Sequence, residues 1–220
     1  MAAGAQASML ASVTVNAGAY TLQYNPNPTF GSFVTTFSSG NSVGFEWAVP
    51  AAVNLSSLGG ASASANFSLP SFTITANAGY ALSGLNAGLG NIVYFAFGSG
   101  ANASITAAGQ YSVNGGATTA TPWSAMSKTV VTPAGSSNPE FGYFADGGPL
   151  VAGGFNTFSL SSASITLNTS GGTFVSIGAQ PQNKLSFTFT AAPVPEPETY
   201  ALMLAGLAMV GFLARRRQVL

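Results

Sequence analysis

Three carboxylates are the side chains of the first 190 residues best suited to acid–base chemistry: Glu46, Glu140 and Asp146. Two carboxyl groups about 5–9 Å apart could act as the catalytic pair of a glycoside hydrolase. Glu140 and Asp146 stand six residues apart in the segment EFGYFADGG. On a single strand they would share a face at a distance of about 20 Å. We interpret Asp146-Gly147-Gly148 as a hairpin turn instead, so we predict no catalytic residue.

Other catalytic and metal chemistries lack their usual residues. The chain has no histidine and no cysteine, which removes the commonest general base and the usual soft metal ligands. Ser127 and Lys128 are adjacent, so on a strand they would point to opposite faces. No segment has the lysine and context of a phosphate-binding loop. We therefore expect a protein that is not an enzyme and holds neither a metal nor a cofactor.

The two tryptophans are candidates for contacts with sugar rings, which would make the body a carbohydrate-binding module. Trp47 alternates with Phe45 and Val49, a pattern that indicates a core position. Trp123 follows a proline in a polar stretch, so we predict that it is exposed and stacks on a ligand. Ice binding is a further alternative, because Thr73 and Thr75 form a Thr-x-Thr pair, although one such pair is ordinary strand composition.

The elements that must position these residues are strands. Between residues 12 and 190, short apolar runs alternate with period two, as Leu185, Phe187 and Phe189 do between polar neighbours. Paired glycines separate many of the runs and suit tight turns. Only TPWSAMSK (121–128) has the pattern of a short helix. We predict an all-β body over 12–190, an antiparallel β-sandwich or a jelly roll.

Composition excludes one class of partner. Charged residues make up 5% of the 220-residue chain and the net charge is zero. A surface without a basic patch cannot gain the counterion release that drives nucleic-acid binding. Because aromatic residues reach 11%, the low charge does not indicate disorder. We expect a folded domain with a hydroxyl- and amide-rich surface and no nucleic-acid partner.

The C-terminal segment has three ordered features. Residues 191–199 form a proline-rich linker, 200–214 are an uninterrupted apolar run, and 215–220 begin with three arginines. Basic residues directly after an apolar run stay in the cytoplasm, so we predict a single transmembrane helix over 200–214 and a cytoplasmic basic tail over 215–220, with Arg215, Arg216 and Arg217 as the stop-transfer signal. At about 22 Å the helix is short for the roughly 30 Å hydrocarbon core. The large side chains of the predicted span include Tyr200, Leu202, Leu204, Leu207, Val210 and Phe212.

This ending resembles the PEP-CTERM sorting signal. The resemblance rests on Pro195-Glu196-Pro197, the apolar run and the terminal arginines, and covers roughly residues 193–217. It implies export in a Gram-negative bacterium that makes exopolysaccharide, and processing by an exosortase, a membrane cysteine transpeptidase. Pro195, Glu196 and Pro197 would be the recognition element. The same signal occurs on ice-binding proteins, but it is an address shared by unrelated bodies.

The first eleven residues leave two alternatives open. Ala5-Gln6-Ala7 has the small-x-small form of a signal-peptide end, but the basic region and apolar core are missing. Residues 1–11 are either the remnant of a longer signal peptide or a disordered alanine-rich leader.

Taken together, these patterns predict an exported protein. It would be held in the inner membrane by its C-terminal helix before processing and would then reach the cell surface or the extracellular matrix. We expect a structural or adhesive role in exopolysaccharide or biofilm.

Overall fold

The computed structural model describes residues 11–31, 33–180, 182–194 and 197–217. These residues form 13 strands, a short 3-10 helix between the ninth and tenth strands, and one α-helix at the end. The strands before the 3-10 helix are β1 (Val13–Asn16), β2 (Tyr20–Asn25), β3 (Thr35–Ser39), β4 (Ser42–Ala48), β5 (Asn54–Ser68), β6 (Ser71–Ala76), β7 (Tyr80–Phe97), β8 (Asn102–Val113) and β9 (Thr119–Ala120). After η1 (Trp123–Met126) come β10 (Lys128–Val131), β11 (Glu140–Phe155), β12 (Thr157–Gly178), β13 (Lys184–Pro193) and α1 (Pro197–Arg217). The all-β prediction is confirmed.

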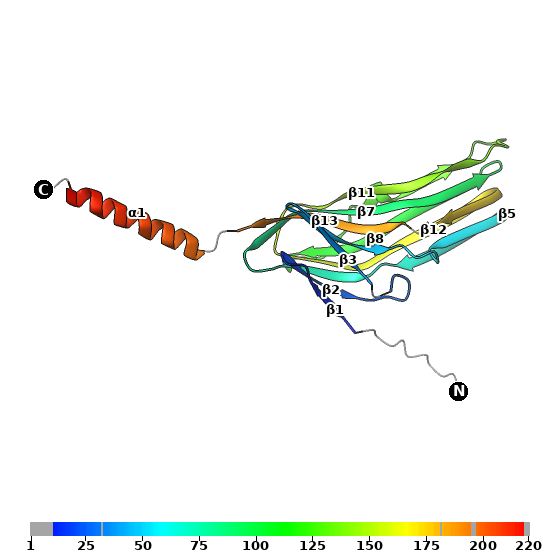
Figure 1. Ribbon diagram of the computed structural model, residues 1–220. Helices are drawn as coiled ribbons and strands as arrows, with labels where there is room; N and C mark the ends of the chain where they lie inside the picture. Colours follow the sequence, from blue (N-terminus) through cyan, green and yellow to red (C-terminus); the bar gives the residue numbers. More distant parts are fainter. Residues whose placement is uncertain (1–10, 32, 181, 195–196, 218–220) are drawn as a thin grey trace, which may run out of the picture.

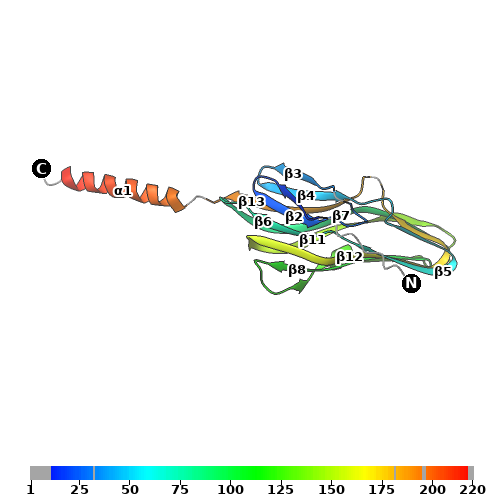
Figure 2. The same ribbon diagram turned by 90° about the horizontal axis from the view of Figure 1, so that it is seen from below.

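The 13 strands are joined by hydrogen bonds into one antiparallel network, which folds into two sheets that lie face to face (Figures 1 and 2). The first sheet has the order β1-β2-β6-β12-β8-β10. The second half of β5 also belongs to this sheet, because it pairs with β12 on the same side as β6. The second sheet has the order β3-β4-β13-β7-β11. This arrangement confirms a β-sandwich.

The two sheets are joined because β5 and β12 pass from one to the other. Residues 63–68 of β5 pair with β12 in the first sheet, whereas residues 174–178 of β12 pair with both β5 and β7 in the second. At the crossing, Gly60 lies opposite Gly171. Gly59, Gly60, Gly171 and Gly172 all have positive φ, a conformation that costs glycine little. Strands that change sheets through such bends make the corners of a sandwich.

Aromatic and aliphatic side chains from both sheets fill the space between them. Phe72 of the first sheet contacts Phe187 of the second with ring centroids 4.7 Å apart. Trp47 is fully buried, as its alternation with Phe45 predicted. The Tyr20 hydroxyl crosses the core and donates a hydrogen bond of 2.7 Å to the Gly44 carbonyl. Alternating apolar residues thus position the outward-facing side chains of each sheet.

Several sequence-based turns lie inside strands. Asp146, Gly147 and Gly148 pair with β7 in the middle of β11, so the predicted hairpin turn there is wrong. A Cβ on Gly147 would lie 2.6 Å from the Ala87 carbonyl oxygen, so this glycine allows close approach of the neighbouring strand. Gly115 does follow Asn114 in a true turn between β8 and β9, where both residues have positive φ.

Candidate functional site

The sorting segment follows directly on the last strand of the second sheet. β13 ends with Pro193 opposite Tyr80, and the Val194 amide donates a hydrogen bond to the Gly79 carbonyl at 2.8 Å. Pro195 and Glu196 lie outside the described residues, and Pro197 is the first residue of α1. The predicted recognition element therefore begins one residue after the last hydrogen bond of the body.

α1 covers the predicted apolar helix. Residues 200–211 are all exposed, with Leu202 at 74% and Met209 at 67%, and α1 stands apart from the sheets in Figure 1. Within the described ranges, no helix reaches both the length and the apolar character required for crossing a membrane. The helix is thus confirmed, and its prediction as a transmembrane span is not. Arg215, Arg216 and Arg217 form its last turn.

The body carboxylates Glu46, Glu140 and Asp146 lie on β4 and β11 of the second sheet. Glu46 forms an ion pair with Lys184, and its Oε1 lies 2.9 Å from the Lys184 Nζ. Glu140 and Asp146 lie on one strand, β11, and the chain does not turn between them. The separation of about 20 Å expected for six strand residues therefore applies, apart from a bulge after Phe144.

Trp123 is 2% exposed, so the prediction that it stacks on a ligand is wrong. It begins η1 and packs against β8, where a Cβ on Gly109 would lie 3.2 Å from its ring. Met126, three residues on, is buried with it. One turn of 3-10 helix places residues i and i+3 on one side, so the Trp-x-x-Met spacing was a signal that Trp123 belongs to the core.

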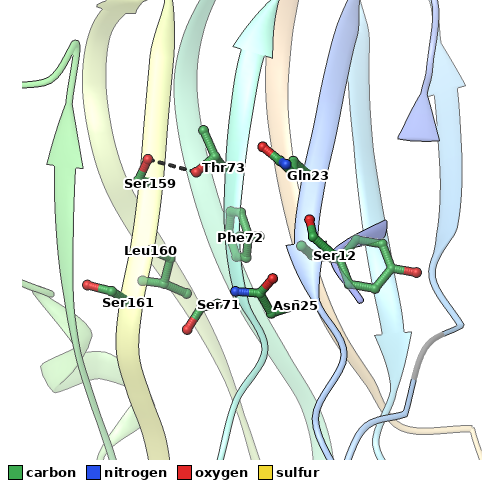
Figure 3. A pocket seen from close by; sticks show the side chains of 10 residues that line it. Ser12, Gln23, Asn25, Ser71, Phe72, Thr73, Ser159, Leu160 and Ser161 are labelled. Atoms are coloured by element: carbon green, nitrogen blue, oxygen red, sulfur yellow. Dashed lines mark hydrogen bonds between the residues drawn. The ribbon is translucent and has the colours of Figure 1, made fainter. Parts of the chain in front are cut away.

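Two outer faces offer binding surfaces in place of Trp123. The first is the outer face of the first sheet, which carries a row of hydroxyl and amide side chains. Gln23 lies opposite Thr73, and Thr73 opposite Ser159, with the two hydroxyl oxygens 2.9 Å apart. Figure 3 shows these side chains around a shallow hollow of about 370 Å³. The residues lining this hollow include Ser12, Gln23, Asn25, Ser71, Thr73, Ser159 and Ser161.

The second surface is an exposed aromatic cluster at the end of the second sheet farthest from α1. We call Phe95, Phe141, Tyr143 and Phe174 the aromatic strip. Phe141 and Tyr143 are 60% and 58% exposed, and their ring centroids are 5.7 Å apart. The Phe95 and Phe174 rings, on β7 and β12, lie 5.8 Å apart and are partly exposed. Sequence analysis missed this cluster because its members come from three strands far apart in the chain.

The comparisons with known proteins identify the tail and leave the body without a family. Residues 193–217 match the PEP-CTERM protein-sorting motif, which confirms the resemblance seen in the sequence and indicates export and exosortase processing. No curated protein matches the chain.

Similar solved structures are distant. One is TmCBM61 in complex with beta-1,4-galactotriose, at 10% identity, with 84% of this chain and 88% of that chain covered and a TM-score of 0.19. Another is infectious bursal disease virus, Gt strain, at 12% identity, with 81% of this chain and 53% of that chain covered and a TM-score of 0.20. At these TM-scores the likenesses carry no argument about fold or ligand.

Proposed function

We propose that this chain is an exported, non-catalytic surface protein whose β body adheres to extracellular polysaccharide. The observation that carries the proposal is the sorting motif at 193–217, which begins at Pro193, the last residue of the last strand of the body. An exosortase would recognise Pro195, Glu196 and Pro197 in the linker and separate α1 from the body. A proline-rich segment suits such a cleft because its rings already restrict the backbone, so little chain entropy is lost on binding.

A transient stay at the inner membrane is part of the proposal. The apolar side chains of residues 200–211 in α1 are exposed to solvent. Exposed apolar helices gain free energy by entering lipid or an apolar protein surface. We propose that the inner membrane, and then the exosortase, supply that surface until processing releases the body.

The adhesive role is supported by the outer face of the first sheet. Its outward residues along β12 are hydroxyl or amide side chains: Thr157, Ser159, Ser161, Ser164, Thr166, Asn168 and Ser170. Such side chains both donate and accept hydrogen bonds, as the hydroxyl groups of a polysaccharide do. This row carries no charge, which suits a neutral or weakly charged polymer. An uncharged row does not attract charged partners by long-range electrostatics.

The sorting role is tested by replacing the recognition element. With Pro195, Glu196 and Pro197 changed to alanine together, we expect full-length protein to remain in the inner membrane of a host that has an exosortase. Mass spectrometry of the wild-type protein released by that host should show a C-terminus near Pro197. Glu198→Ala is the matched control, because it removes the neighbouring carboxylate at the start of α1 and keeps the tripeptide. Equal release of the triple variant and the control would contradict recognition of the tripeptide.

The non-catalytic role is tested separately with the host's purified exopolysaccharide. Prolonged incubation with the protein should release no new reducing ends, because Glu46 is ion-paired and the other two carboxylates share one strand. Release that is lost in Glu140→Gln would overturn this part of the proposal.

A carbohydrate-binding module with a defined sugar site is the second candidate, and the aromatic strip favours it. Large exposed apolar patches on otherwise polar proteins mark binding surfaces.

A further inference from the structure

We propose that the aromatic strip and the hollow beside it form a binding site for one chain of a neutral polysaccharide. This inference rests on the proposed adhesive function and names the place where the polymer is held. The site lies on the outer face of the second sheet, where β11, β7, β12 and β5 run side by side.

Strand register brings the aromatic residues into neighbouring rows. Phe141 lies opposite Phe95. Two residues further along β11, Tyr143 lies opposite Val93. Phe174 of β12 follows on the other side of β7, opposite Leu58 of β5, which is 69% exposed. With strands about 4.8 Å apart, four strands present a face about 14 Å wide. A face of this size accommodates a short run of sugar rings.

The rings can contact sugars through the apolar side of a pyranose. The C–H groups on one side of such a ring form a flat apolar surface that packs on an aromatic ring by dispersion and burial. Phe141 and Tyr143 meet edge to face, at an interplanar angle of 71°. A polymer that lies on the face of one ring therefore contacts the edge of the other, which gives the site two different surfaces.

Hydrogen-bonding groups continue the aromatic strip across β12 and β5. A hollow of about 230 Å³ is lined there by Asn54, Ser56, Ser176 and Gln180, together with Leu55, Val93, Ile177 and Gly178. In the described part of the chain, no hydrogen bond uses the side chains of Ser56, Ser176 or Gln180. Ser176 lies directly opposite Phe95. Ligand sites combine apolar walls with a few polar groups that fix orientation, and this surface has both.

The chemistry of the surface favours a neutral glycan over other polymers. The ionisable side chains beside the aromatic strip are the Tyr143 phenol, Glu140 directly before Phe141, and Lys128, whose ammonium donates to the Ala145 carbonyl at 3.3 Å. Glu140 and Lys128 carry opposite charges, so the surface has no net charge that would favour phosphates or an acidic polymer. Protein-binding surfaces with aromatic residues are usually also enriched in arginine, which these rows lack. The site also lies at the end of the body away from α1 (Figure 1), where a chain held by its tail would meet a surrounding matrix.

The test compares two double variants of the full chain, purified in mild detergent, by affinity electrophoresis. The gels contain hydroxyethylcellulose, a neutral soluble glucan, or polysaccharide purified from the host matrix. Phe141→Ala with Tyr143→Ala should weaken binding about tenfold or more, since truncation of central aromatic contacts typically has such effects. Phe141→Tyr with Tyr143→Phe keeps both rings and should bind nearly as wild type does.

Phe33→Ala is the matched control, because Phe33 is 80% exposed and lies outside the strip. Its binding should equal that of the wild type. Equal circular-dichroism spectra and urea midpoints of all variants would show that the changes act on binding alone. Binding that persists unchanged from about 0.05 to 0.5 M salt would support a contact without ion pairs.

The outcomes separate this site from the proposed function. If wild type and the Phe141→Ala, Tyr143→Ala variant bind the host polysaccharide equally, this site is wrong while the adhesive function stands. If wild type binds neither polymer although it is released normally, the adhesive function fails and this site fails with it. If the strip instead mediates self-association, seen as a dimer in sedimentation that the double variant loses, its occupant is a second copy and the glycan assignment is overturned.

Discussion

At the scale of single residues, Tyr20 shows how one polar group is accommodated between two apolar sheets. Its hydroxyl is buried and donates to the Gly44 carbonyl across the core. Burial disfavours the charged phenolate and raises the pKa of Tyr20 well above its usual range. The hydroxyl therefore stays protonated in the folded protein over the pH range in which an exposed tyrosine begins to ionise.

Because of this raised pKa, we expect the free energy of unfolding to decrease at alkaline pH. Above about pH 10 the unfolded chain loses the Tyr20 proton while the folded chain keeps it, so the free energy of unfolding falls as pH rises, by about 1.4 kcal/mol per pH unit from this group. Tyr20→Phe should remove that contribution and cost about 1–2 kcal/mol at neutral pH, because the Gly44 carbonyl loses its donor. Urea titrations from pH 7 to 11 would check both effects. Burial also raises the pKa of Tyr24. Its effect on the pH dependence of unfolding is the same in the wild type and in Tyr20→Phe. Parallel pH profiles of the two proteins would show that Tyr20 does not titrate as argued.

At the scale of elements, the corner where β5 and β12 change sheets depends on glycine for two reasons. One is backbone conformation, since Gly59 and Gly172 have φ of 61° and 63°. The other is space. A Cβ on Gly172 would lie 2.4 Å from the Ala101 Cβ and 2.6 Å from the Phe97 carbonyl oxygen, whereas a Cβ on Gly59 would meet nothing within 4 Å. The two glycines therefore separate the conformational requirement from the steric one.

The corner gives a matched pair of substitutions. Gly59→Ala should lower the free energy of unfolding by about 1–2 kcal/mol, the cost of a left-handed conformation for alanine. Gly172→Ala should lower it by about 1–3 kcal/mol more, because neighbouring backbone must move. Urea denaturation of both variants measures the difference. Equal losses would mean that the β12 turn relaxes freely and that packing against Ala101 does not define the corner.

At the scale of the whole molecule, the body and the tail are built for separation. The last hydrogen bond of the body joins Val194 to Gly79, and α1 begins at Pro197. Removal of the helix breaks none of the contacts described within the sheets. The aromatic strip lies at the opposite end, so loss of the tail would leave it unchanged.

A chain that ends after Val194 should therefore keep the stability of the full chain, within about 0.5 kcal/mol, as expected when no structural contact is lost. The urea midpoint and slope of the truncated and full-length proteins, both in the same mild detergent, would check this. A chain that ends after Thr190 is the comparison, because it also loses the pairing of Ala191, Ala192 and Pro193 with β7, and it should be less stable. A large loss already on truncation after Val194 would show that α1 supports the body.

Features that depend on contiguous residues could be predicted from the amino-acid sequence. The sorting motif is a linear signal, so Pro195-Glu196-Pro197 and the following apolar run were recognisable without a fold, and residues 193–217 match it. Period-two alternation predicted the all-β class and the burial of Trp47, because one face of each strand must be apolar.

Features that depend on pairing between distant strands could be seen only in the folded structure. It buried Trp123 against β8 and placed Asp146-Gly147-Gly148 within β11, where the neighbouring strand overrides local turn preference. It also assembled the aromatic strip from β7, β11 and β12. Register between strands is set by the packing of whole sheets and not by local composition. An address can therefore be found from a short stretch of sequence, whereas a binding face exists only once the strands are paired.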